Sequence, residues 1–175
     1  MDVHALARIA GRIDGLTSAI GRAAAWLAAF MVCAEVAAVL LRYALGLGSI
    51  CLSESILYAH AALFMLAAAW TLGEGGHVRV DVFYAVASPR AKAAIELVGA
   101  LVLLLPFVIA ILVLSWPYVV RSWAVLERSR EASGLPAVFL LKTLIPAFAV
   151  LLGLQGLAQA MRAVGVLATR AEQPG

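Results

Sequence analysis

Hydrophobic residues gather in four long runs along the chain, with short polar stretches between them. The runs cover about 23–41, 56–72, 97–120 and 137–161. Each is close to the ~20 residues that an α-helix needs to cross the hydrocarbon core of a bilayer. Because lipid offers no hydrogen bonds to backbone N–H and C=O groups, helices are the expected structure of such runs. The pattern predicts an all-α membrane protein with four transmembrane helices in a single membrane domain, 1–175.

The residues before the first run follow a different pattern. Over 1–22, apolar side chains from Val3 to Ile20 recur every three or four positions, and charged side chains fall mostly between them. This spacing predicts an amphipathic helix, and a basic amphipathic helix beside a span tends to lie in the membrane interface. Two roles are open for this arm: it anchors the chain end on lipid, or it grips a partner subunit.

The segment 73–92 is the most polar part of the chain between the apolar halves. Gly75–Gly76 predicts the end of the second helix, and Ser88–Pro89 predicts the start of the next one. Polar side chains alternate with valines between these points: His77, Arg79 and Asp81. We expect a short interfacial element here, with Phe83 and Tyr84 at headgroup level.

Local signals also mark the second half of the chain. Pro106 and Pro117 lie within the third run, and proline in a membrane helix usually produces a kink. The segment 121–133 carries charges of both signs, and we expect it to continue the third helix beyond the membrane until Gly134–Pro136 stops it. At the start of the second run, Glu54 suits the positive end of a helix dipole.

Lys and Arg are distributed unequally between the two sides of the predicted membrane domain. The arm, the middle loop and the tail 162–175 together hold eight of them, against four on the opposite side. Positive charge in short loops favours the cytoplasmic side. We therefore expect both termini and the middle loop in the cytoplasm, and 121–133 outside it.

Composition supports a membrane protein and excludes several classes. Hydrophobic residues make up 65% of the chain and charged residues 13%, far from the balance of a soluble domain. The basic residues lie at the ends of the apolar runs and form no stripe, so the net charge of +3 does not indicate nucleic-acid binding. Cys33 lies inside a run and Cys51 outside it, which predicts neither a disulfide nor a metal site. No cofactor is expected.

Three ionisable residues fall inside the runs: Glu35, His60 and Lys142. Counting from the outer ends of their helices at 1.5 Å per residue places each about 9–10 Å deep. Unpaired charge at that depth is costly, so pairing is expected. We predict an ion pair between Glu35 and Lys142, with His60 close enough to hydrogen-bond one of them, which would fix the helix arrangement. The alternative is that Lys142 extends to the interface alone, while Glu35 is protonated or pairs with a partner subunit.

Five stretches, in this order and spacing, resemble the small membrane subunit of TRAP transporters, the Q-type (DctQ-like) component. They are Leu41–Tyr43, Glu54, Gly76–Asp81, Ser115–Trp123 and Gly134–Pro146, and the resemblance covers about 40–162. The chain departs from the family in reading Ile50–Ser53 where a tryptophan commonly precedes the acid. Together with the charges of the outer segment, these stretches give the following candidates for family-motif and partner-contact residues: Arg42, Tyr43, Glu54, His77, Arg79, Asp81, Trp116, Pro117, Tyr118, Trp123, Glu127, Arg128, Arg130 and Pro136.

The resemblance implies a role in secondary active transport and no enzymatic activity. In such a three-part system of the bacterial inner membrane, a periplasmic binding protein captures an organic acid anion and a large permease subunit carries it with sodium. The small subunit would hold no substrate site and would pack as a scaffold beside the permease. The proline-rich second half resembles most a branch associated with carboxylates such as 2-oxo acids.

Two other classes of protein are alternatives. A small multidrug antiporter also has four spans and a glutamate in the first, here Glu35, but such chains are shorter and lack a segment like 121–133. A haem- or quinone-binding redox protein would need a second histidine level with His60, whereas His4 and His77 lie outside the runs.

Overall fold

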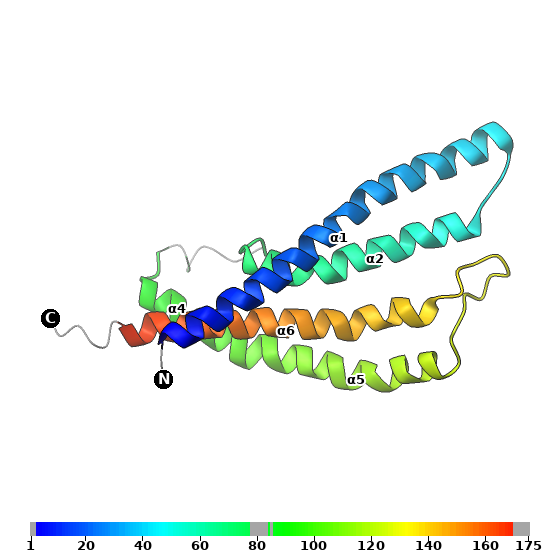
Figure 1. Ribbon diagram of the computed structural model, residues 1–175. Helices are drawn as coiled ribbons and strands as arrows, with labels where there is room; N and C mark the ends of the chain where they lie inside the picture. The colour runs from blue at the N-terminus through cyan, green and yellow to red at the C-terminus, as the bar shows by residue number, and fades with distance from the viewer. Residues whose placement is uncertain (1–2, 78–83, 85, 170–175) are drawn as a thin grey trace.

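The computed structural model describes residues 3–77, 84 and 86–169, and this part of the chain is helical with no strand (Figure 1). Four of its helical segments are long and apolar enough to cross a membrane: 4–45, 50–73, 89–124 and 138–168. The prediction of an all-α protein with four such helices is confirmed. In chain order the elements are α1 (Val3–Leu45), α2 (Ile50–Gly73), α4 (Pro89–Val98), the π-helical η1 (Gly99–Leu104), α5 (Leu105–Ala124) and α6 (Val138–Thr169).

The arm and the first span are one helix, not two. α1 runs without a break for 43 residues, so the boundary predicted between 22 and 23 has no counterpart in the backbone. The alanines that follow Arg22 favour helix and carry the arm directly into the span. On the packed side of the arm, Ala10 and Thr17 are buried, while Ile9 and Leu16 of its apolar stripe are about half exposed.

Small residues on that packed side allow α1 to approach its neighbours closely. At Gly21, an added Cβ would lie 2.5 Å from the Cβ atom of Trp70 in α2, closer than carbon atoms tolerate. Only glycine leaves room for the tryptophan at this crossing. The long apolar side chains on the other side of the arm remain available to lipid.

The last helix is the centre of the arrangement. α6 packs against α1, α2, α4 and α5. Its Ala149 and Leu152 form the buried cluster with Val108 of α5. Figure 1 shows α6 between α2 and α5, and both termini at the same end of the molecule. The α1–α2 hairpin diverges from α5 and α6 toward the opposite end, where the loops 46–49 and 125–137 lie.

The third span contains a π-helical turn directly before its first proline. The N–H of Leu105 donates to the carbonyl of Ala100, five residues earlier, in place of the usual four. Pro106 has no N–H to donate, and its ring would crowd the carbonyl four residues back. A widened turn relieves that crowding, so the irregularity predicted at Pro106 takes the form of η1. Pro117 lies inside α5 without ending it.

The predicted end of the second helix and the predicted start of the next one, on either side of the middle loop, are both confirmed. α2 ends at Gly73, and Gly75 has a positive φ of 68°. The hydroxyl of Ser88 accepts from the N–H of Ala91 at 3.2 Å, with Pro89 as the first helical residue. The interfacial element expected at 78–83 lies outside the described residues, as do Arg79 and Asp81.

The helix expected over 121–133 is wrong beyond its first turn. α5 ends at Ala124, and Leu126 has a positive φ of 45°. A residue in the left-handed region cannot continue a right-handed helix. The segment 125–137, here called the outer loop, therefore folds back toward α6, and Gly134–Pro136 lies within this loop and ends no helix.

Candidate functional site

Glu54 joins α2 to the outer loop. α2 begins at Ile50, capped by the hydroxyl of Ser49, which accepts from the N–H of Leu52 at 3.2 Å. Glu54 therefore lies in the second turn, and the role predicted for it as a helix-start charge is wrong. One carboxylate oxygen accepts from the N–H of Leu135 at 2.5 Å, and the other accepts from the hydroxyl of Ser129. The Glu54 carboxylate thus attaches the outer loop to α2 through two hydrogen bonds.

The tight path of the outer loop requires glycine at position 134. A Cβ added to Gly134 would lie 2.3 Å from the Ser129 hydroxyl and 2.8 Å from a carboxylate oxygen of Glu54. The N–H of Ser129 also donates to the carbonyl of Leu135 at 3.2 Å, which closes the loop on itself. The outer loop and Glu54 of α2 therefore form one closely packed unit that requires glycine at position 134.

Lys142 forms an ion pair with Glu127 of the outer loop. Its ammonium also lies 3.9 Å from the centroid of the Tyr118 ring, a cation–π distance. The predicted pair between Lys142 and Glu35 is therefore wrong. Lys142 lies in the second turn of α6, and the N–H of Val138 donates to the carbonyl of Glu127 at 3.1 Å, so the loop brings its own carboxylate to the lysine. The Lys142 ammonium lowers the pKa of Glu127.

Aromatic residues near the end of α5 differ in their contacts. The indole N–H of Trp123 donates to the hydroxyl of Thr143 at 2.8 Å, and its ring meets Phe139 edge-on at 4.7 Å between centroids. Trp116 is 59% exposed. Trp123 therefore connects α5 to α6.

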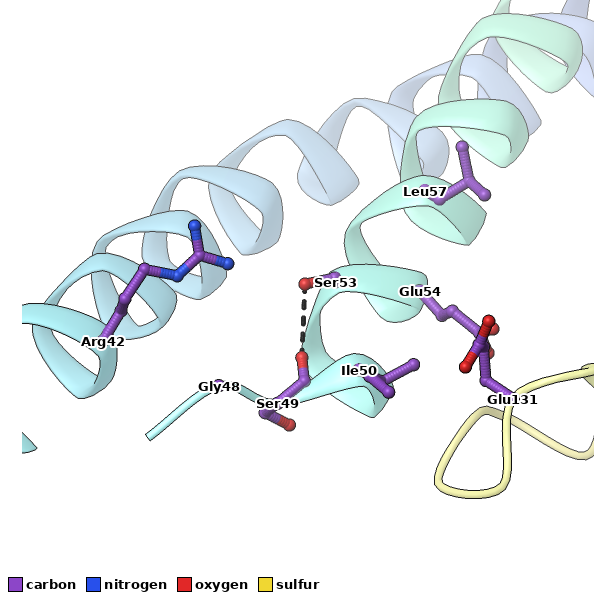
Figure 2. A pocket seen from close by; sticks show the side chains of 8 residues that line it. All are labelled: Arg42, Gly48, Ser49, Ile50, Ser53, Glu54, Leu57 and Glu131. Atoms are coloured by element: carbon purple, nitrogen blue, oxygen red, sulfur yellow. Dashed lines mark hydrogen bonds between the residues drawn. The ribbon is translucent and has the colours of Figure 1, made fainter. Parts of the chain in front are cut away.

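A groove of about 570 Å³ opens where the outer loop faces the ends of α1 and α2. Figure 2 shows Glu54 and Glu131 at its loop side and Arg42 across from them on α1. A second cavity of about 240 Å³ shares Arg42 and Ser53 with it and extends along α1 to Glu35. The eight lining residues of the groove are Arg42, Gly48, Ser49, Ile50, Ser53, Glu54, Leu57 and Glu131.

The remaining site candidates from the sequence are mostly at the surface. Arg128 and Arg130 are exposed on the outer loop, and Pro136 is exposed beside them. Tyr43 is 84% exposed at the end of α1, and His77 is exposed after α2. The loop thus exposes two arginines while Glu54 of α2 and Lys142 of α6 hold it in place.

A polar network at the other end of the molecule was not predicted. Gln155 of α6 is fully buried. Its amide nitrogen donates to Asp14 at 2.8 Å, and its amide oxygen accepts from the Thr17 hydroxyl at 2.8 Å. Arg162 pairs with the same Asp14 carboxylate at 2.7 Å. The signal was present in the sequence, since Gln155, Gln159 and Arg162 share one face of a helix at spacings of four and three.

The structure offers no evidence of a metal centre within its described residues. Among 3–77, 84 and 86–169, no three His, Cys, Asp or Glu side chains come together in a way that could hold an ion. Cys33 and Cys51 are both free and exposed. The polar groups around the outer loop and the groove are therefore carboxylates, arginines and hydroxyls.

Comparison with known protein families gives one result. A family model described as the DctQ component of tripartite ATP-independent periplasmic transporters matches residues 18–165. No curated protein and no solved structure matches the chain. The matched range includes the outer loop and every residue that lines the groove, while Asp14 precedes it.

Proposed function

Because the chain belongs to the family of DctQ components of tripartite ATP-independent periplasmic transporters, we propose that it is the fixed scaffold subunit of its transporter. Members of this family are transporter components and work with a large permease and a periplasmic binding protein. In this role the chain has no substrate site of its own. It supports the permease during ion-coupled uptake of an organic acid anion at the bacterial inner membrane.

The use of polar side chains within the described helices supports a scaffold. Lys142 and Gln155 are both engaged in contacts that join one segment of the chain to another. Coupled transport normally relies on broken helices that expose backbone groups near the middle of the membrane. The main irregularity of the described spans is η1, and it remains helical and hydrogen-bonded. Nothing in this arrangement resembles an ion-coordinating break.

Uptake measurements on purified components test the scaffold role. Liposomes that hold only this chain should show no sodium-dependent uptake of a 2-oxo acid, because the permease carries the substrate. Liposomes with this chain, the permease and the binding protein should show uptake, and omission of this chain should abolish it. Uptake by this chain alone, above the level of empty liposomes, would overturn the proposal.

We further propose that the outer loop faces the periplasm and contacts the binding protein. The unequal distribution of Lys and Arg favours this orientation, and both termini lie at the end opposite the loop (Figure 1). Arg128 and Arg130 are exposed there on a loop that Glu54 holds in place. The carboxylate substrate class follows from the resemblance of the proline-rich second half. The family match gives no support to the antiporter or redox alternatives.

A further inference from the structure

Two ionisable side chains within the spans are exposed, Glu35 of α1 and His60 of α2. Glu35 is exposed on α1, in one stripe with Val32, Val36 and Val39, which are 65%, 54% and 46% exposed. His60 is exposed on α2, in one stripe with Leu57 and Phe64. We call these seven residues the hairpin face: Val32, Glu35, Val36, Val39, Leu57, His60 and Phe64.

The two stripes adjoin along the seam between α1 and α2. The cavity of about 240 Å³ is lined by Glu35 and Val39 from α1 and by Ser53 from α2. Ser53 and His60 are seven residues apart, so they lie on the same side of α2. Glu35 therefore borders a recess large enough for the end of a long side chain, and His60 lies two turns further along the same side of α2.

Neither ionisable side chain has a partner in the described part of the chain. Lys142 pairs with Glu127 and Arg162 pairs with Asp14, so neither of these cations is the partner of Glu35. Arg42 lines the same cavity as Glu35 without forming an ion pair with it. Ionisable residues inside membrane spans almost always face protein or a water-filled cavity, and they pair there, because lipid tails supply no hydrogen bonds. Glu35 and His60 are exposed, and the cavity beside Glu35 is open to a side chain from another subunit.

The exposed surface of α5 provides the contrast. Val113 and Leu114 are 63% and 75% exposed, and no charged residue occurs between Leu105 and Val120. This surface is suited to lipid as it stands. Exposure of apolar side chains alone therefore does not distinguish the two faces, whereas the carboxylate at Glu35 does.

We propose that the hairpin face is the surface that binds the large permease subunit, and that a lysine or arginine of a permease membrane helix enters the recess beside Glu35. The proposal rests on the scaffold role proposed above and adds the face and the chemistry of the contact. A cation is the complement of an unpaired carboxylate at this depth. His60 contributes a hydrogen bond to the same partner helix.

Co-isolation of the permease with a tagged copy of this chain tests the proposal. Recovery of the permease with the unmodified chain comes first, and its absence would overturn the scaffold role itself. Given recovery, Glu35→Lys should lower the amount of co-isolated permease about tenfold or more, because it leaves two cations facing each other. Glu35→Gln should lower it less. Val39→Trp should also lower it, by steric blockage, whereas the matched variant Val113→Trp on α5 should leave it unchanged.

Two controls separate binding from folding. Each variant is compared with the unmodified chain for its yield and melting temperature in detergent, and Val39→Trp tests the same face without a charge change. Reversal of the permease cation to glutamate should restore co-isolation with Glu35→Lys. Equal recovery of the permease with Glu35→Lys, Val39→Trp and Val113→Trp would overturn the proposal and leave the scaffold role standing. Co-isolation of two differently tagged copies of this chain through the hairpin face, with the permease absent, would overturn it too.

Discussion

Replacement of Glu54 by alanine should release the outer loop while leaving the membrane helices folded. The carboxylate accepts from the N–H of Leu135 at 2.5 Å and from the hydroxyl of Ser129, and both bonds involve a charged acceptor. Hydrogen bonds to charged groups contribute about 1.5–3 kcal/mol each when buried. Because this site is only partly buried, we expect the free energy of loop opening to fall by about 2–4 kcal/mol in total.

Limited digestion with trypsin measures that opening directly, because Arg128 and Arg130 lie on the loop. Cleavage of a folded loop follows the population of its open form. A loss of 2 kcal/mol corresponds to roughly a 30-fold faster cleavage, since each 1.4 kcal/mol is a factor of ten. The matched control is Glu131→Ala, which removes a neighbouring exposed acid of the same loop and should change the rate little.

Gly134→Ala provides an independent test of the same unit. The new methyl group would lie 2.3 Å from the Ser129 hydroxyl and 2.8 Å from the Glu54 carboxylate, so the loop must move away from the carboxylate. Its effect should therefore overlap with that of Glu54→Ala, and the double variant should be cleaved little faster than either single one. Equal cleavage rates for Glu54→Ala and Glu131→Ala, or full additivity with Gly134→Ala, would refute the reasoning.

Three further predictions concern charge and the buried network. Reversal of Arg128 and Arg130 to glutamate should lower uptake with the binding protein present, most clearly at low salt, because exposed charges are screened within about 10 Å at 0.1 M; equal uptake at all salt concentrations would contradict docking on this loop. Because Lys142 lowers the pKa of Glu127, the stabilisation from their pair is present above the ordinary carboxyl pKa of 4.5 and is lost as the pH falls through the lower folded value. The melting temperatures of the unmodified chain and Glu127→Gln should therefore converge in acid, and a constant difference would exclude the pair as the cause. Gln155→Leu should destabilise the protein by about 1–3 kcal/mol, because it removes the two hydrogen bonds that join α6 to Thr17 and Asp14 of α1; an unchanged melting temperature would show that the network adds no stability.

The sequence was most informative where the physics is local or where lipid imposes it. Four apolar runs become four helices because a bilayer permits little else. Ser88 and Pro89 begin a helix and Gly75 follows the end of one. These roles follow from the preferences that each residue type has on its own. In each case the cause lies within a few residues of its effect.

The pairing of Lys142 with Glu127 depends on a turn at Leu126 that the composition of the segment does not indicate. The segment 121–133 has helix-compatible residues and no glycine or proline, which favoured a continued helix. The positive φ of Leu126 redirects the chain and brings Glu127 to Lys142. The pair with Glu35 was predicted from matching depth in the membrane, which takes no account of a carboxylate that the loop brings back to Lys142.

The polar network around Gln155 was not predicted from the sequence for a different reason. Asp14 and Gln155 are 141 positions apart. Spacing along one helix shows which of its residues share a face, but it does not show which helix that face meets. The apolar periodicity of the arm predicted an amphipathic helix, whereas the side that packs against the other helices is formed by small residues such as Ala10. Contact between distant helices is decided by shape as much as by hydrophobicity.

The central place of α6 has a consequence for biosynthesis. α6 contacts α1, α2, α4 and α5, and it follows all four of them in the chain. During synthesis the packing of α1 against α2 can form before α6 exists, whereas the contacts that connect this hairpin to α4 and α5 run mainly through α6. The joining of the two parts of the molecule is therefore a late step of its assembly. A chain that stops before 138 would lack the helix that connects them.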